Sequence, residues 1–191
     1  MDSKNLASIF FTANKRLSSI IRYNTTLKIR NESVAEHSYF VAFYAMMLAD
    51  FIEGINKQRV LELCLIHDYE ESLSGDIPHY LKMEYPEMNN ALETMNKEIM
   101  NRLLYKDEYY IKLWEESRGD STLEAKLLLF CDKLSCLIYA REEVSMGNKY
   151  MKDILDRVYV MMINMIKGDK NFSSFKNLVD NIYYDTEDGA E

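Results

Sequence analysis

Apolar residues recur at helical spacing along most of this chain. Residues 4–16 carry a first amphipathic pattern, and residues 33–54 carry a second that is apolar over most of its length. The clearest long pattern covers residues 121–146. Further helices are predicted at 57–67, 86–104, 108–117, 150–167 and 171–184. The alternation typical of a strand is absent, so the sequence predicts an all-α fold of roughly seven to nine helices.

Local signals mark the ends of the two most apolar helices. Ser33 followed three residues later by Glu36 makes a capping box, which predicts that the second helix begins just after Ser33. Gly147 and Asn148 predict the end of the long helix, because both residues tolerate the left-handed backbone that terminates helices.

The chain shows no internal boundary. Residues 22–33 are polar and irregular and residues 68–78 are acidic, but neither segment is a low-complexity linker, and no repeat is present. We therefore expect one domain over residues 1–184. The acidic residues 185–191 are expected to form a frayed tail.

Composition and charge narrow the class further. Only 6 Gly and 2 Pro leave few turn signals, and a net charge of −8 without a basic stripe argues against a nucleic-acid polymer as partner. The odd number of cysteines, each in an apolar run, predicts buried reduced thiols (Cys64, Cys131 and Cys136). No apolar run approaches the roughly 20 residues of a membrane span, and no signal peptide is recognisable. We expect a cytoplasmic protein that does not contact a membrane.

Candidate metal ligands come from three different apolar segments. His37 and Asp132 lie inside predicted helices, and His67 with Asp68 ends another. Each has an ordinary explanation taken alone: a histidine can be a hydrogen-bonded core or surface residue, and Asp132 can pair with Lys133 or Arg141. A buried carboxylate is nevertheless costly unless it is paired or binds a metal.

If the three helices converge, these residues form a site with two imidazoles and two carboxylates. Such a ligand set suits Mn, Co, Ni, Fe or Zn.

These residues resemble a known family. An EHS segment, an HD pair thirty residues later and an aspartate in a long downstream helix are similar to the signature of HD-domain metal-dependent phosphohydrolases. The resemblance to the bacterial 5′-deoxynucleotidase branch covers most of residues 16–148, through the stretches RYNTTLKIRNESVAEHS, HDYEESLSGDIP and CDKLSCLIYAREEVSMGN. It implies an all-helical HD domain around a buried metal site, one divalent metal (Co, Mn, Ni, Fe, Zn or Mg), phosphate-ester hydrolysis on nucleotides and often a homodimer.

The resemblance also implies roles for single residues. The residues that match the metal ligands are His37, His67, Asp68 and Asp132. Glu71 matches the acidic residue beside the attacking water, and Asp76 matches a second acidic residue at the sugar and phosphate end of the pocket. Arg22 matches a phosphate-binding arginine. Tyr23 follows it where the best-known members carry tryptophan, a departure that puts a strict preference for deoxyribose in doubt.

The histidine count favours one metal over two. Relatives with two metals need additional histidines, and only His79 remains here. Lys82 and Lys133 are further candidates for positive charge near the phosphate, while Glu142 and Glu143 are expected to face solvent or a partner subunit.

The apolar segment 158–166 is either core or a subunit interface, and we favour the interface.

The leading hypothesis is therefore a 5′-nucleotidase that hydrolyses deoxyribonucleoside 5′-monophosphates, with Glu71 and Asp76 as catalytic residues and Arg22, Tyr23 and Asp76 binding the substrate. One alternative is a dNTP triphosphohydrolase on the same scaffold, which needs more cations than the sequence offers near the site. Another is a nucleotide sensor that binds without turnover.

Overall fold

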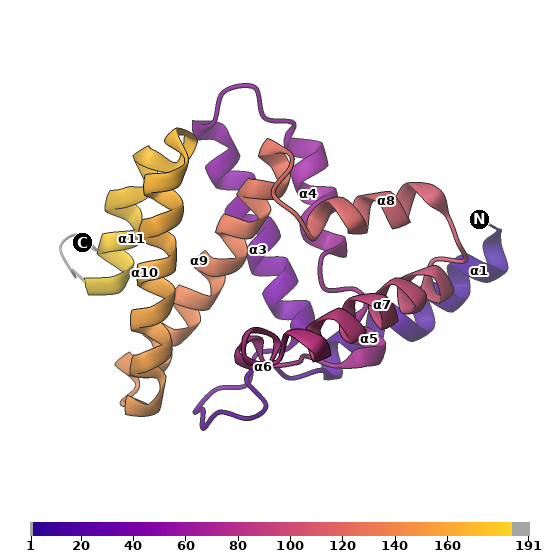
Figure 1. The fold of residues 1–191 in the computed structure, drawn as a ribbon, viewed down its shortest axis with the longest axis horizontal. Helices are drawn as coiled ribbons and strands as arrows, with labels where there is room; N and C mark the ends of the chain where they lie inside the picture. The colour runs from indigo at the N-terminus through magenta and orange to yellow at the C-terminus, as the bar shows by residue number, and fades with distance from the viewer. Residues whose placement is uncertain (1, 185–191) are drawn as a thin grey trace.

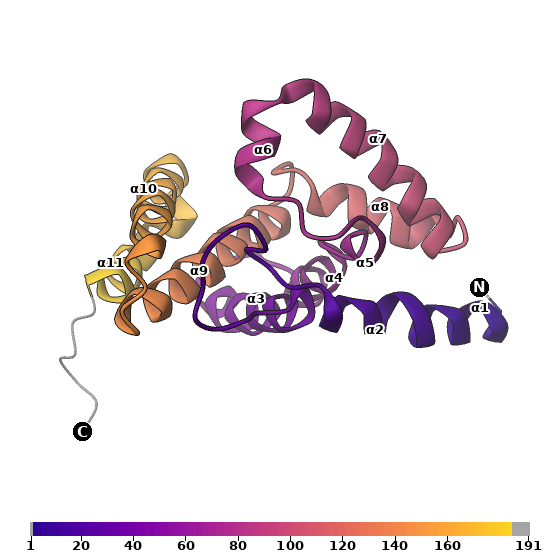
Figure 2. The same cartoon turned by 90° about the horizontal axis from the view of Figure 1, so that it is seen from below.

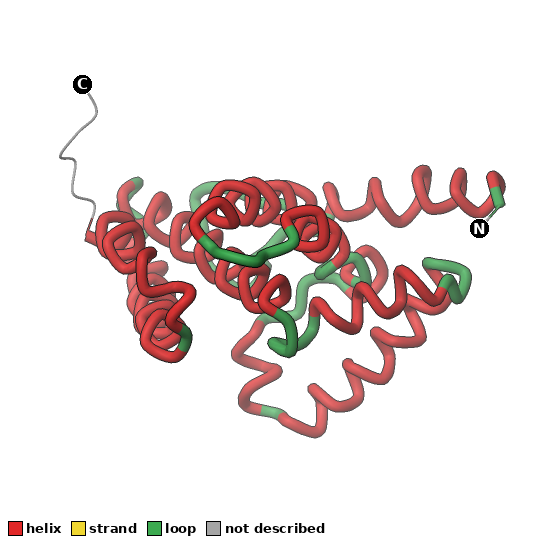
Figure 3. The backbone as a smooth tube through the Cα atoms, turned by 90° about the horizontal axis from the view of Figure 1, so that it is seen from above, coloured by secondary structure: helices red, strands yellow, loops and turns green. Residues whose placement is uncertain are grey.

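Helices form nearly all of the regular structure in the computed structural model, which describes residues 2–184 (Figure 3). Within that range no strand occurs, and the one extended contact is an isolated antiparallel bridge between Ile21 and Ser33. The predicted all-α class is confirmed. The predicted tail, residues 185–191, lies outside the described residues.

Most of the helices are joined by short connections, apart from the long irregular segment of residues 20–33 before α3 (Figure 1). They are α1 (Ser3–Ser8), α2 (Asn14–Arg16), α3 (Val34–Leu48), α4 (Lys57–Ile66), α5 (Glu71–Ser74), α6 (His79–Glu84), α7 (Pro86–Leu103), α8 (Glu108–Ser117), α9 (Leu123–Ser145), α10 (Lys152–Gly168) and α11 (Lys176–Tyr184). A π-helical turn, Ile9–Ala13, joins α1 to α2, and 3₁₀ turns lie at Leu17–Ser19, Ala49–Phe51, Lys149–Met151 and Lys170–Phe175.

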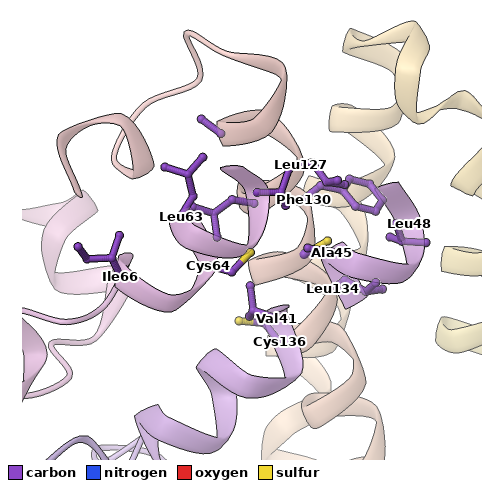
Figure 4. Packing of buried hydrophobic residues seen from close by; sticks show 14 of the residues in the cluster. Val41, Ala45, Leu48, Leu63, Cys64, Ile66, Leu127, Phe130, Leu134 and Cys136 are labelled. Atoms are coloured by element: carbon purple, nitrogen blue, oxygen red, sulfur yellow. The ribbon is translucent and has the colours of Figure 1, made fainter. Parts of the chain in front are cut away.

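Helix α9 is the centre of the fold. It packs against α3 and α4 on one side and against α10 on the other (Figure 1). Figure 4 shows the core at this crossing, where Val41, Leu63 and Phe130 come from three different helices. All three cysteines are free and buried, as predicted. Within residues 2–184, no helix combines the length and the apolar character that crossing a bilayer requires.

The N-terminal segment departs from a regular helix. Helix α1, the π-helical turn and α2 follow directly one after another, and together they project from the body of the protein (Figure 2). Ala13 and Leu17 are its buried residues, which explains the amphipathic pattern there.

Two short helices were not predicted from the sequence. The acidic segment contains α5, which ends where Gly75 adopts φ +75°, and α6 follows Pro78 without having been predicted. Pro78 is the N-cap residue of α6, and proline suits the start of a helix because the N–H that it lacks would have no partner within the helix there.

The apolar segment 158–166 forms part of α10 and is divided between two environments. Val158, Met162 and Ile166 are buried in the core, while Val160 and Met161 are 56% and 41% exposed. The core therefore takes one face of the helix, and a subunit interface on the other face stays a prediction.

Candidate metal centre and active site

His37 lies in the first turn of α3, and a capping box holds the start of that helix. The Ser33 hydroxyl accepts a hydrogen bond from the Glu36 N–H at 3.2 Å, and the Glu36 carboxylate accepts one from the Ser33 N–H at 2.7 Å. The predicted capping box is confirmed. The His37 imidazole is completely buried, and its Nδ1 lies 3.1 Å from the Ser135 hydroxyl on α9.

His67 and Asp68 follow directly after the last residue of α4. The Nδ1 of His67 lies 2.7 Å from the Cys64 carbonyl oxygen. A carbonyl only accepts hydrogen bonds, so Nδ1 carries a proton and donates it. In the neutral imidazole this leaves Nε2 free as a ligand atom, the arrangement usual for metal-binding histidines. Nε2 lies 3.1 Å from Asp68 Oδ2.

Asp132 approaches the same point from the middle of α9. Its Oδ1 lies 3.2 Å from His37 Nε2, which is also 3.7 Å from Asp68 Oδ2. One ligand atom each from His37, His67 and Asp132 fall within 4.8 Å of one another. The structure thus brings together the four residues that the sequence nominated, and Asp132 pairs with Lys133 at 2.9 Å.

The cluster fits a divalent cation. The Nε2 atoms of His37 and His67 are buried. Each lies within 3.2 Å of a carboxylate oxygen of the cluster, but neither forms a well-oriented hydrogen bond, which is costly for polar atoms unless something binds them. Two imidazoles and two carboxylates form the mixed nitrogen and oxygen set that suits borderline divalent metals. These four residues could therefore hold one divalent cation.

Local charges keep both carboxylates ionised. Burial on its own raises the pKa of Asp68 and Asp132, but the histidines and Lys133 outweigh it and hold both pKa values below the usual range. The pKa values of the two imidazoles shift in opposite directions. Burial and Arg22 lower the pKa of His37 to about 4, whereas Asp68 overcomes burial and raises the pKa of His67 to about 9.

Arg22 reaches the cluster from the irregular segment before α3. Its guanidinium donates to Glu32 Oε2 at 2.9 Å and lies 2.6 Å from His37 Nδ1 and 3.4 Å from the Cys136 sulfur. The backbone N–H of Arg22 also donates to the Glu32 carbonyl at 2.9 Å. The side chain is only 12% exposed, and it lines the same cavity as Asp68 and Asp132.

Glu143 anchors this segment, and the prediction that it faces solvent or a partner subunit is wrong. The side chain is completely buried and accepts hydrogen bonds from the N–H groups of Ile29 and Arg30 and from the Asn148 amide, each at 2.7 Å. These bonds fix the segment on the surface of α9. Glu142 is half exposed and pairs with Arg30 at 2.6 Å.

Tyr23 and Asp76 connect the segment before α3 to the turn after α5. Tyr23 has a φ of +54°, and its ring stacks on Tyr139 with centroids 4.8 Å apart. Its N–H donates to Asp76 Oδ2 at 3.2 Å, and the side chain of Asn24 donates to the Asp76 carbonyl at 3.0 Å. The Tyr23 hydroxyl is buried without a hydrogen-bond partner.

The two adjacent glutamates after Asp68 have different surroundings. Glu70 accepts hydrogen bonds from the Trp114 indole at 2.8 Å and from Arg118 at 3.1 Å, which ties it to α8. Glu71 is also buried, but its Oε2 has no partner. Burial, reinforced by Asp68 and Asp76, raises the pKa of Glu71 well above its usual value.

A cavity of about 280 Å³ contains the exposed side of the cluster. It brings together most of the predicted site residues: Arg22, Tyr23, Asp68, Glu71, Asp76 and Asp132, with the candidate cations Lys82 and Lys133. The sequence missed the residues that α6 and α10 add to the wall, Tyr80, Ile154, Arg157, Val158 and Met161. The α10 residues share one face of that helix, but no sequence signal placed that face at the site.

The order of the ligand-bearing helices defines the class of protein. A histidine on α3, a His-Asp pair after α4 and an aspartate on α9 are the arrangement of an HD domain. The HD domain family model matches residues 14–188, and the chain belongs to that family. The family resemblance stated from the sequence is confirmed.

Individual relatives narrow the comparison. A 5′-deoxynucleotidase of Yersinia pestis is 31% identical over 160 residues, which cover 74% of this chain and 76% of the relative. An HD-domain phosphohydrolase of Listeria innocua has a similar fold, with a TM-score of 0.71, 24% identity and coverage of 93% and 89% of the two chains. The HD phosphohydrolase DatZ of cyanophage S-2L, solved with dA and one catalytic Zn²⁺ ion, gives a TM-score of 0.71 at 16% identity, covering 97% and 98%.

Metal binding tests the cluster directly. We expect one divalent ion per chain in the unaltered protein, and a loss of affinity of about 100-fold or more in His67→Ala and Asp132→Ala, because each variant removes a ligand. Asp50→Asn, which alters an exposed carboxylate outside the cluster, is the matched control. Metal content after equilibrium dialysis is the measurement. Full metal content in both ligand variants would contradict the site.

The role of Glu143 leads to a stability prediction. In Glu143→Gln, an amide NH₂ replaces one of the two oxygens that accept from the backbone N–H groups of Ile29 and Arg30. Because one buried donor then loses its acceptor, the free energy of unfolding should fall by about 2–3 kcal/mol. Burial alone would raise the pKa of Glu143, but its hydrogen bonds keep that pKa below the usual 4.5 in the folded protein. The ionised carboxylate therefore stabilises the fold fully above pH 4.5. This stabilisation is lost as the pH falls through the pKa of the folded state. Urea unfolding at several pH values measures this.

Glu142→Gln is the neighbouring control, since an exposed pair contributes less than about 1 kcal/mol. Equal losses in the two variants would refute the anchoring role.

Proposed function

We propose that this protein is a metal-dependent phosphohydrolase that converts deoxyribonucleoside 5′-monophosphates to nucleoside and phosphate. The observation that carries the proposal is the cluster of His37, His67, Asp68 and Asp132 at the wall of a cavity that Arg22 and Glu71 also line. The Yersinia relative, named a 5′-deoxynucleotidase, supports the substrate class.

The four clustered residues would hold the divalent ion. When bound there, the ion supplies Lewis acidity and positive charge next to a phosphoryl group. Arg22 provides the protein's own charge: its planar guanidinium suits two phosphate oxygens. The contact with Glu32 orients that guanidinium before substrate arrives.

Glu71 is the residue placed for proton transfer. Glu71 lines the cavity, three residues after Asp68, and its Oε2 has no hydrogen-bond partner among the described residues. There it can orient the attacking water and accept a proton from it. A carboxylate that the fold leaves without a hydrogen-bond partner is available for this task, whereas Glu70 is occupied by Trp114 and Arg118.

Asp76 and Tyr23 are placed for the sugar. One carboxylate oxygen of Asp76 accepts from the Tyr23 N–H, and no described residue donates to the other, which leaves it to accept from a 3′-hydroxyl. The Tyr23 ring, held against Tyr139, narrows the cavity beside this group. We propose that this ring crowds a 2′-hydroxyl and so favours deoxyribose.

The balance of charge favours a monophosphate over the alternative dNTP substrate. The cavity is lined by four cations and four carboxylates, namely Arg22, Lys82, Lys133 and Arg157 against Asp68, Glu71, Asp76 and Asp132. With a divalent ion these side chains carry two positive charges in excess, and Glu32, which pairs with Arg22 from outside the lining, reduces the excess to one. That excess suits a monophosphate better than the more highly charged triphosphate.

Separate incubations of the metal-loaded protein with dAMP, AMP and dATP test the proposal. We expect phosphate release from dAMP, slower release from AMP, and no intact triphosphate from dATP. Intact triphosphate as the main product would support the triphosphohydrolase, and no turnover of any substrate would refute the proposal.

A variant of Glu71 distinguishes enzyme from sensor. In Glu71→Gln we expect kcat to fall by about 100- to 10,000-fold, because proton transfer is lost, while metal content and nucleotide affinity remain. Steady-state kinetics and calorimetry give these quantities. An unchanged rate together with intact nucleotide binding would favour the sensor.

A further inference from the structure

One face of α10 forms a cavity wall to which the proposed function assigns no contact with the substrate, beyond counting the charge of Arg157. Ile154, Arg157, Val158 and Met161 follow the spacing of a single helix face and all line the cavity that holds the metal cluster. Three of the four are apolar. Arg157 is therefore the single hydrogen-bonding side chain that α10 offers to a bound substrate.

The donors of Arg157 are available to a ligand. Its Nε donates to the carbonyl of Asp153 one turn earlier at 3.1 Å. No carboxylate within the described part of the chain forms an ion pair with it, although the protein carries an excess of acidic residues. The outer nitrogens of its guanidinium are left as a planar pair of donors at the cavity.

The surroundings of Arg157 fit a nucleobase better than a phosphate. A phosphate needs several converging donors or cations, and those lie with Arg22, Lys133 and the metal cluster. A base has an apolar face and a polar edge. The α10 wall offers apolar side chains beside one donor pair, and Tyr80 on α6 adds an aromatic ring to the same cavity.

We propose that Arg157 is a specificity residue that reads the edge of the base and favours guanine. Guanine presents two adjacent acceptors, O6 and N7, which match the paired donors of arginine, while adenine presents an amino donor in place of O6. This inference rests on the proposed function, because it assumes a nucleotide whose phosphate lies at the metal cluster.

Binding and turnover together test the proposal. Calorimetry with deoxyguanosine and deoxyadenosine needs no catalysis, and kcat/KM for dGMP and dAMP provides the second readout. We expect the unaltered protein to prefer the guanine compounds by roughly tenfold in both measurements. Arg157→Ala should abolish the preference by weakening guanine binding, with the values for adenine nearly unchanged.

Arg157→Gln makes the test sharper. Glutamine pairs with the N6 and N7 edge of adenine, so this variant should shift the preference toward deoxyadenosine. Lys167→Ala, which removes a cation from α10 outside the cavity lining, is the control and should keep the original preference.

The outcomes separate the two claims. Equal affinity of the unaltered protein for both nucleosides, undetectable binding of either, or a guanine preference that survives in Arg157→Ala would each overturn the role of Arg157. A preference in nucleoside binding that Arg157→Ala removes, in a protein that releases no phosphate from any monophosphate, would support the base contact and refute the phosphohydrolase proposal.

Discussion

Two imidazoles and two carboxylates meet where α3, α4 and α9 cross, and the rest of the molecule is arranged around that meeting point. Polar and charged groups at such a crossing are costly unless they bind one another or a cation. Leu63, Val41 and Phe130 pack the same three helices together nearby, so the core holds the ligand-bearing backbone in place (Figure 4). The Cys64 carbonyl then orients His67, and the capping box at Ser33 sets the turn that carries His37.

A second interaction, the anchoring of the segment before α3 by Glu143, positions the residues proposed to bind the substrate. The irregular segment before α3 has no helix of its own to hold it, and the buried carboxylate of Glu143 supplies the attachment through the N–H groups of Ile29 and Arg30. Arg22 and Tyr23 lie in the same segment, and the contact of Tyr23 with Asp76 ties it to the turn after α5. The metal cluster and the cavity are thus set by separate interactions. A variant in the anchor should disturb the position of Arg22 without removing a metal ligand.

Sequence reasoning reached the helical class, the long α9 and the four clustered residues, because helical periodicity and buried polar residues leave signals that are local in the chain. Glu143 was misjudged because two of its three partners are backbone N–H groups more than a hundred positions earlier, and the pattern of side chains in the sequence does not reveal such contacts. The short α6 was missed because its first turn follows a proline that also marks turns. Arg157 was missed for a geometric reason: its place in the cavity depends on how α10 crosses α9, and periodicity gives the face of a helix but not what that face meets.

The central claim concerns one ion held by three helices. Crystals of the protein loaded with Zn²⁺, measured at the zinc absorption edge, test it most directly through an anomalous difference map. The account predicts one strong peak per chain, with the Nε2 atoms of His37 and His67 at about 2.0–2.1 Å and oxygens of Asp68 and Asp132 in its coordination shell. No peak at this position, or a peak that leaves out His37 and Asp132, would contradict it.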